Sequence, residues 1–473
     1  MNKQNATVEQ SQAGQAYGWG FWVWLVSSVL FVLLIVFFIG AWSVRHITIS
    51  KDHPRFSDDQ ANMILFIADF PVFAKSTIQQ LWSEQKEPAL AQLIDRETTE
   101  KSYWVRHFPK SEDSGYLLFS GMDPAAKQAI VKLIRIADGE TVASWIPDWS
   151  ALNEQITEQK FSPKGSSNSL RAFHPLLLAD GDIIFNTYNL LVRQNSCSSK
   201  PVWVLDERFH HSNELDETGT GIWVPSVTQD GFPNNSWLRE KIRDDALAHI
   251  STDGRLLERL SFVSIMRENG MEQMLLSSPG LDGGDPVHLN EIKVATQDTR
   301  YWHRGDLLIS SAQLNTLFLY RPSTNKIIWH KTGPWMRQHS VDFIDDHRIS
   351  VFNNNVMSVA DIKHQFNTPN DTNQVMVYDF NNEQVTQPFA ALLAEAKPLT
   401  ISEGRARLLP DGGLFLEESN YGRHLRFSKD HLLWSRVNDY DDKRIGLVSW
   451  SRYLTAEEAH VPLQALSKRK CAP

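Results

Sequence analysis

Short apolar runs separated by polar turns repeat along the chain after about residue 115. An Asp-containing turn dipeptide follows six residues after His174, His339 and Arg405, and the distance from His174 to Trp203 equals that from Arg405 to Trp434. A turn at a fixed offset, followed by an alternating run, is typical of hairpins repeated as a unit. Repeats of this length predict an all-β fold, a six-bladed β-propeller in which each blade is a four-stranded sheet around a common axis.

Two segments do not follow the strand-and-turn repeat, and a third is predicted to complete it. Residues Asp58–Arg96 carry a helical spacing of apolar residues, broken once by Pro71, and predict a short helical neck. The insertion Gln229–Asp245 predicts a solvated helix that includes Arg243 and Asp244. Leu447–Tyr453 is predicted to return to the first blade and to close the ring.

The N-terminal part has a different pattern. No charged residue occurs in 17–44, and the apolar run Phe21–Ala41 is long enough to cross a bilayer and too long for a cleaved signal peptide, so we expect a retained anchor. The predicted parts are a polar tail, a transmembrane anchor, a linker with the helical neck, the propeller and a C-terminal tail (1–16, 17–44, 45–114, 115–460 and 461–473).

Flanking charge leaves the orientation of the anchor open. Lys3 and the terminal amine precede the span and are opposed by Glu9, whereas Arg45, Lys51 and Arg55 follow it. Taken alone, the excess of basic residues after the span favours a cytoplasmic propeller. Long domains, however, are translocated largely regardless of flanking charge.

Composition excludes several classes of function. The chain of 473 residues has a formal net charge of −9 and no basic run before its last few residues, which gives no support to nucleic-acid binding. It has no P-loop, no dinucleotide-binding glycine pattern and no nucleophile elbow. Its two cysteines, Cys197 and Cys471, could pair in an oxidising compartment or remain as two thiols, and sequence alone does not decide between these.

The residues that open the innermost strands are the candidate functional residues, because these strands line the central channel. They are His174, His211, His288, His339 and Arg405. Histidines that share one channel could bind an anion, bind a metal, or act as acid, base and nucleophile. The neighbouring His210 alternates away from His211, so we assign it to packing or solvent.

Several short motifs between about residues 170 and 455 resemble those of the bacterial arylsulfate sulfotransferases in order and spacing. The motifs are Phe209-His210-His211-Ser212, Asp285-Pro286-Val287-His288-Leu289-Asn290, Leu308-Ile309-Ser310-Ser311, Gln338-His339 and Ile349-Ser350-Val351-Phe352-Asn353-Asn354. The resemblance implies a six-bladed propeller that moves a sulfuryl group from a phenolic sulfate ester to another phenol without a nucleotide donor. It also implies a periplasmic propeller, here on a single-pass inner-membrane anchor.

By this resemblance, His339 is the nucleophile that becomes sulfated at nitrogen. His211 and His288 bind the sulfuryl oxygens and exchange protons with the phenols. A neutral imidazole is a competent nucleophile, and its sulfated form divides one difficult transfer into two easier ones. The implied partners are an aryl sulfate donor and a phenolic or glycan hydroxyl acceptor, and no cofactor is implied.

One motif departs from the family's pattern. The family's Ser-Ser-Arg is here Ser310-Ser311-Ala312-Gln313, so Ala312 stands where the sulfate-binding arginine is expected. The candidates to replace it are Arg405, which the repeat places near the axis, and Arg337, beside His339. Asn290 lies two residues after His288, on the same side of a strand, and is a further candidate ligand for the substrate.

Two other classes of function stay open on the sequence. Four axial histidines could instead bind a metal, with Glu214 and Glu291 as supporting carboxylates. Loss of the arginine would also suit a non-catalytic propeller that binds a ligand through its channel.

Overall fold

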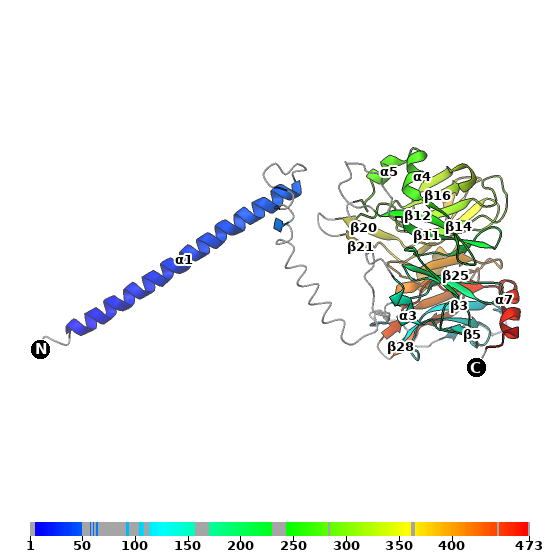
Figure 1. The fold of residues 1–473 in the computed structure, drawn as a ribbon, viewed down its shortest axis with the longest axis horizontal. Coiled ribbons are helices and arrows are strands. Elements are labelled where there is room, and N and C mark those ends of the chain that lie inside the picture. The colour runs from blue at the N-terminus through cyan, green and yellow to red at the C-terminus, as the bar shows by residue number, and fades with distance from the viewer. Residues whose placement is uncertain are drawn as a thin grey trace. The chain divides into compact units, whose positions relative to one another are not determined.

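The computed structural model describes residues 5–49, 57, 60, 63–64, 91–93, 104–107, 113–156, 170–228, 243–281, 284–360, 365–441 and 444–471. The chain forms two compact units, Met1–Glu87 and Pro88–Pro473 (Figure 1).

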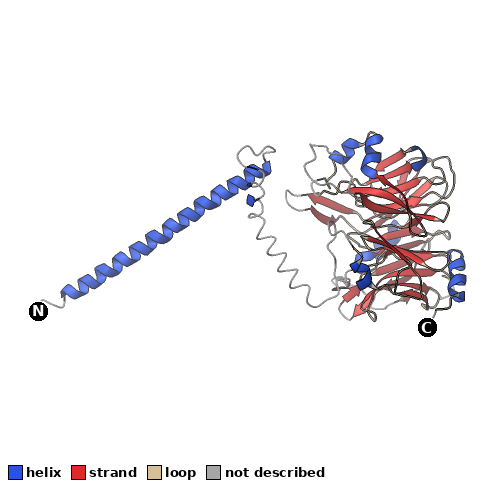
Figure 2. Ribbon diagram, viewed as in Figure 1, coloured by secondary structure: helices blue, strands red, loops and turns tan. Residues whose placement is uncertain are grey.

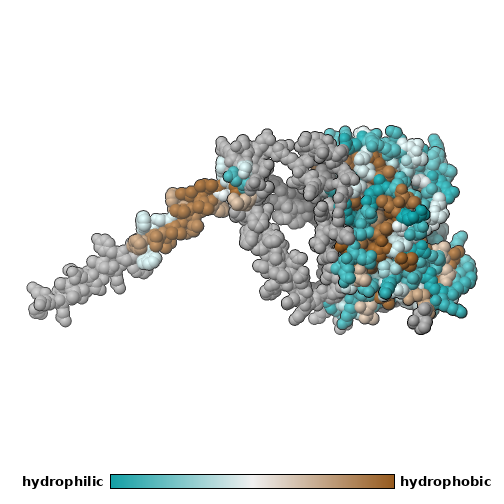
Figure 3. Space-filling model, in the orientation of Figure 1, coloured by the Kyte–Doolittle hydropathy of each residue, from teal (hydrophilic) through white to brown (hydrophobic). Residues whose placement is uncertain are grey.

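The first unit contains the long helix α1 (Asn5–Ile49), of which Phe21–Ser43 is apolar and exposed. Figure 3 shows mostly apolar side chains on the visible side of this stretch. Its 23 residues span about 34 Å at 1.5 Å per residue, enough to cross the hydrocarbon core of a bilayer. A helix of this length that is apolar on all sides is typical of a membrane span.

The second unit is a six-bladed β-propeller, as the repeats predict. Figure 2 shows that it consists mostly of strands. The strands of each blade are given from the inner to the outer one. Blade one is β30 (Arg452–Leu454), β3 (Tyr116–Asp123), β4 (Gln128–Arg135) and β5 (Thr141–Trp145), and blade two is β6 (Phe173–Leu177), β7 (Ile183–Asn186), β8 (Leu190–Gln194) and β9 (Trp203–Asp206); blade three is β10 (Glu214–Leu215), β11 (Gly221–Thr228), β12 (Asp244–Ser251) and β13 (Leu256–Ser261). Blade four is β14 (Leu289–Val294), β15 (Leu307–Ser311), β16 (Thr316–Arg321) and β17 (Lys326–Thr332), and blade five is β18 (Val341–Phe343), β19 (Arg348–Asn353), β22 (Gln374–Asp379) and β23 (Gln384–Thr386); blade six is β24 (Arg405–Leu408), β25 (Leu414–Glu418), β26 (Arg423–Phe427) and β27 (Leu432–Val437).

Smaller elements decorate the blades. They are β1 (Ala91–Leu93) with β29 (Arg444–Gly446) and β28 (Asp439–Asp441), β2 (Val105–Arg106) on β27, the hairpin of β20 (Val356–Ala360) and β21 (Gln365–Pro369), and the helices α3 (Trp149–Glu154), α4 (Phe262–Glu268), α5 (Glu272–Leu276), α6 (Ala390–Ala396) and α7 (Ala456–Lys468). Most of the predicted helical neck lies outside the described residues. Of the described residues in this segment, Gln60, Met63 and Ile64 are helical, as predicted. Ala91–Leu93 instead form a strand, because they pair with β29.

The ring closes through its C-terminal strand, as predicted from the sequence. Strand β30 pairs antiparallel with β3, with Arg452 opposite Leu118, so blade one combines the two ends of the propeller sequence. The pairing of β30 covers the inner edge of β3, which would otherwise be open to association with another strand. Buried apolar residues of β3 and β4 pack on those of blade two to form one of several clusters between blades.

The predicted solvated helix at Arg243 and Asp244 is wrong. Asp244 begins β12 and is fully buried, and so is Asp245. Strand β12 continues the ladder of β11, with Asp244 opposite Thr228. The two carboxylates are buried because each has partners: Asp244 accepts a hydrogen bond from Thr228 Oγ1 (3.1 Å), and Asp245 accepts one from Arg243 Nε (2.6 Å).

A disulfide fixes the C-terminal helix to blade two. Cys197 and Cys471 are bonded, closing a loop across a sequence separation of 274. Helix α7 begins with a capping box between Thr455 and Glu458, and Glu458 also pairs with Arg407 of β24 (2.6 Å). The segment predicted as a tail therefore extends the fold.

Reduction of this disulfide is expected to lower the free energy of unfolding by about 2–5 kcal/mol, because the bond closes a long loop in the unfolded chain. Thermal unfolding of the full-length protein with and without dithiothreitol measures this. The double variant Cys197→Ser/Cys471→Ser is the control and should not respond to the reductant. An equal midpoint for the oxidised and reduced wild type would contradict the expectation.

Candidate functional site

Each blade places one non-glycine residue with left-handed backbone at or just before its innermost strand. These residues, with φ between 45° and 61°, are His174, His211, His288, Arg337, Glu403 and Trp450. A left-handed non-glycine residue costs about 1–3 kcal/mol and persists where the surrounding structure fixes it. The recurring position in blade five is therefore occupied by Arg337, and His339 lies two residues further along the chain.

The structure brings His211, His288 and His339 together, although they come from three different blades. The ring of His211 lies 5.2 Å from that of His288 and 6.2 Å from that of His339, measured between centroids. The buried ring of Trp450 contacts both His211 (5.8 Å) and His339 (5.9 Å). This group of three histidines and Trp450 is called the histidine cluster below.

His339 is held in one tautomer. Its Nδ1 lies 2.6 Å from Oδ1 of Asn354, whose amide nitrogen donates to the carbonyl oxygens of Thr400 and Glu403. The oxygen of Asn354 therefore faces the imidazole, so Nδ1 carries the proton and Nε2 carries the lone pair. That lone pair accepts a hydrogen bond from the backbone N–H of Glu403 (2.9 Å). Burial lowers the pKa of His339 to about 3, so the ring is neutral at pH 7.

His288 has a carboxylate partner. Its Nδ1 lies 2.5 Å from Oδ2 of Asp285, three residues earlier in the same loop. Burial would raise the pKa of Asp285, but His288 and Arg243 hold that pKa below its ordinary value. The ionised carboxylate orients the ring, with Nδ1–H donating to it and with Nε2 directed away from it.

His211 is connected to a carboxylate indirectly. Its Nδ1 lies 2.8 Å from Nδ1 of His210, and Nε2 of His210 lies 3.3 Å from Oδ1 of Asp245. The prediction that His210 turns away from His211 is therefore wrong, because His210 lies in a loop before β10 and does not follow strand alternation. Burial lowers the pKa of both histidines, which favours neutral rings.

The two candidate arginines lie in different places. Nη1 of Arg337 donates to Oε1 of Gln313 (2.7 Å), directly after Ala312, where the sequence lacks the expected arginine. Arg405 lies deeper, with Nη2 3.8 Å from Oε1 of Glu214. Arg337 thus reaches from blade five to the end of β15, beside the histidine cluster.

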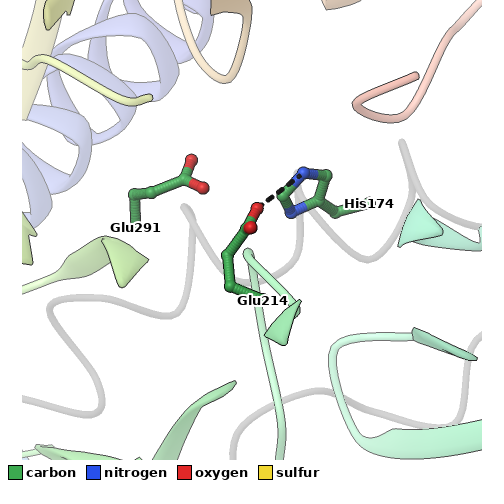
Figure 4. Close-up of side chains that lie close together, drawn as sticks. All are labelled: His174, Glu214 and Glu291. Carbon is green, nitrogen blue, oxygen red and sulfur yellow. Dashed lines mark ion pairs between the residues drawn. The ribbon is translucent and has the colours of Figure 1, made fainter. Parts of the chain in front are cut away.

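A second, ionic cluster surrounds His174, Glu214 and Glu291 (Figure 4). Nε2 of His174 lies 3.5 Å from Oε1 of Glu214, and all three side chains are almost completely buried. Arg452 and Lys293 each approach one oxygen of Glu214 at 3.0 Å. Both oxygens of Glu291 have no hydrogen-bond partner among the described residues, and burial raises the pKa of this carboxyl to about 8.

This cluster does not fit a resident metal, although its three side chains bring donor atoms within 4.8 Å of one another. Both oxygens of Glu214 are already paired with cations, and Arg405 is a third positive group beside them. A divalent ion would add two positive charges to a buried set of cations. His174 lies with Glu214 and does not join the other three histidines as a four-histidine ligand set.

Asn290, a predicted candidate ligand for the substrate, has a contact within the protein. It is fully buried, and its Nδ2 donates to the backbone oxygen of Gln338 (2.7 Å), the residue before His339. This bond connects blade four to the strand entry that carries His339.

Sequence reasoning missed Arg243, Asp245 and Trp450 as parts of the site, and it included Asp285 in a motif without assigning it a role. For Arg243 and Asp245 a signal existed, since the alternating run that follows them directly could have placed them at the start of a strand. Trp450 precedes the strand that closes the ring, so aligning that strand with the other inner strands could have found it.

Comparison with known proteins bears on this arrangement. Residues 174–438, more than half of the chain, match the family model described as Arylsulfotransferase (ASST). No curated protein matches the chain. Similar solved structures include a protein of unknown function from Bacteroides caccae (9% identity, 72% of this chain and 99% of that chain, TM-score 0.41), the periplasmic gluconolactonase PpgL from Pseudomonas aeruginosa (10%, 72% and 99%, 0.38) and the Pan2 WD40 domain from Neurospora crassa (10%, 74% and 94%, 0.36). These scores are too low to bear on function.

Proposed function

Because this chain belongs to the arylsulfotransferase family, we propose that it transfers a sulfuryl group from an aryl sulfate ester to a phenolic or other hydroxyl acceptor through a sulfohistidine at His339. The observation that carries the proposal is the neutral imidazole of His339, whose tautomer leaves the lone pair on Nε2 within the histidine cluster.

In the first half-reaction, Nε2 of His339 attacks sulfur. The nitrogen–sulfur bond forms, the bond from sulfur to the aryl oxygen breaks, and the leaving phenolate takes a proton from a neighbouring histidine. The sulfated ring carries positive charge, which the oxygen of Asn354 stabilises by accepting Nδ1–H (2.6 Å). In the second half-reaction the acceptor hydroxyl gives up its proton, its oxygen attacks sulfur, and the nitrogen–sulfur bond breaks.

The backbone N–H of Glu403 must leave Nε2 before attack, because both groups need the same lone pair. The bond of 2.9 Å therefore describes the resting site. Once displaced, this N–H is available to donate to a sulfuryl oxygen, where negative charge accumulates in the transition state.

Arg337 is the proposed sulfate-binding arginine, in preference to Arg405. Its guanidinium lies beside Gln313 and near His339, whereas that of Arg405 lies beside Glu214 in the ionic cluster. Asn290 is assigned to positioning His339, because its amide nitrogen is bonded to the backbone of Gln338.

Substitution Arg337→Gln is expected to slow sulfuryl transfer by about 100- to 1000-fold, the usual loss when one donor to a developing oxyanion is removed. Steady-state release of nitrophenol from nitrophenyl sulfate measures this. Arg255→Gln, at an exposed turn, is the control and should leave the rate unchanged. A rate within twofold of wild type for Arg337→Gln would show that Arg337 is not the sulfate-binding arginine.

The location follows as part of the proposal. The apolar segment Phe21–Ser43 acts as a single-pass anchor in the inner membrane, with the propeller in the periplasm. The bond between Cys197 and Cys471 supports an oxidising compartment, since disulfides persist there and are rare in the cytosol.

The test of the function is incubation of the full-length protein in detergent with nitrophenyl sulfate, with and without an added phenol. Release of nitrophenol that depends on the added phenol, together with its sulfated product, is the expected result. If no phenol is released and no adduct forms, the protein is a ligand-binding propeller and not a sulfotransferase.

A further inference from the structure

Arg243 lies between two aspartates that contact different histidines. Its Nε donates to Asp245 at 2.6 Å, and its Nη1 lies 3.9 Å from Oδ2 of Asp285. It enters from the segment before β12, whereas Asp285 belongs to the loop before β14, so one guanidinium links blades three and four. The side chain is mostly buried, and its positive charge is little screened by solvent.

Arg243 is paired more closely with Asp245 than with Asp285. Asp245 is bonded closely to Arg243 and faces His210 at 3.3 Å, outside the short range of a strong charged hydrogen bond. Asp285 is only loosely paired with Arg243 and binds His288 at 2.5 Å. The negative charge of Asp285 is therefore available to an imidazolium at His288, while that of Asp245 is neutralised by the guanidinium.

Tautomers follow from the same contacts. Nε2 of His210 faces Oδ1 of Asp245 at 3.3 Å without a hydrogen bond between them, and this carboxylate favours a proton on Nε2 of the neutral ring. Nδ1 of His210 then accepts from Nδ1–H of His211 (2.8 Å). That leaves a lone pair on Nε2 of His211, an atom with no hydrogen-bond partner in the part of the chain that the structure describes. His288 instead donates Nδ1–H to Asp285 and can carry a second proton on Nε2.

We propose that Arg243 and Asp285 assign the transferred proton to His288 alone, and keep His211 as a neutral ring that takes no part in proton transfer. The inference rests on the proposed sulfuryl transfer. In the first half-reaction, Nε2–H of His288 protonates the leaving phenolate oxygen as the bond from sulfur to oxygen breaks. In the second, neutral His288 takes the proton of the acceptor hydroxyl as the bond from oxygen to sulfur forms, which restores the starting state. Arg243 and Asp285 act through His288 and are positioning residues.

Leaving groups of different basicity test this assignment. Phenyl sulfate needs a proton on its departing oxygen more than nitrophenyl sulfate does, because phenolate is the stronger base. In Asp285→Asn, kcat/KM for phenyl sulfate is expected to fall at least about tenfold more than for nitrophenyl sulfate. A merely structural role would lower both equally, and an equal loss would overturn the proposal. His211→Gln should show no such dependence on the leaving group.

Charge assignment is tested separately by NMR of the full-length protein in detergent, labelled with ¹³C at histidine Cε1. The Cε1 signal of His288 should move toward that of a neutral imidazole in Asp285→Asn, where the carboxylate that supports an imidazolium is lost. The signals of His210 and His211, whose pKa values burial lowers, should keep the positions of neutral rings. The charged or titratable groups facing His288 are Asp285, Arg243, Asp245, His210, His211 and His339. If the signal of His288 does not move, the assignment is wrong, whatever the enzyme does. If it moves but wild type transfers no sulfuryl group, the assignment of charge holds and the proposed function fails.

Discussion

Substitution His339→Ala is expected to abolish the sulfated protein intermediate and to reduce phenol release by at least about 1000-fold, because loss of a covalent nucleophile typically removes most of the catalysis. Intact mass of the full-length protein after incubation with nitrophenyl sulfate measures the intermediate directly. Wild type should gain one sulfuryl group, and an added phenol should discharge it.

The matched control is His330→Ala, which removes an exposed histidine from the outer strand β17. This variant should form the adduct as wild type does. An adduct of the same mass on His339→Ala would assign the nucleophile to another side chain, and His211, whose Nε2 carries the free lone pair, would be the first to test. Asn354→Leu is to be compared with His339→Ala in the same assay, because it keeps the imidazole of His339 but removes the oxygen that fixes its tautomer.

Substitution Glu291→Gln is expected to change how the stability of the propeller depends on pH. The carboxyl is fully buried, and burial, together with the neighbouring charge of Glu214, raises its pKa to about 8. A raised pKa means that the folded state retains a proton that the unfolded state has lost. The stabilisation is therefore complete below the unfolded pKa near 4.5 and disappears as the pH rises toward 8.

Wild type should accordingly lose roughly 2–4 kcal/mol more than Glu291→Gln in free energy of unfolding between pH 5 and pH 8. Urea unfolding at several pH values measures this difference between the two proteins. Glu258→Gln, on the exposed face of β13, serves as the control and should follow wild type. Parallel curves for wild type and Glu291→Gln would show that Glu291 is ionised in the folded protein, paired with Arg405 or Arg452.

The blades were predictable because their signals are local. Turn dipeptides at fixed offsets from His174 and Arg405 mark hairpins, and strand alternation extends over each run between turns. The closing strand was predictable as well, since a propeller requires one and the run at Leu447–Tyr453 remained. The start of β12 was missed because Arg243 and Asp244 are polar, and their burial depends on partners that are distant in sequence.

The site was predictable in part. The motifs around His211, His288 and His339 identified three rings that the fold brings together. The role of Arg405 could not be judged, because its neighbour Glu214 lies in another blade, and only their distance shows that this arginine belongs to the ionic cluster. The same holds for Arg337, whose bond to Gln313 crosses from blade five to blade four.

The sequence by itself determined the apolar span, the six-bladed ring, the family and the three histidines of the cluster, since each depends on periodicity or on short motifs along the chain. Tertiary structure alone decided which tautomer His339 adopts, which histidine has a carboxylate partner, and where each arginine lies. Those properties depend on distances of 2.5 to 3.9 Å between side chains in the folded protein, at which hydrogen bonding and charge change steeply.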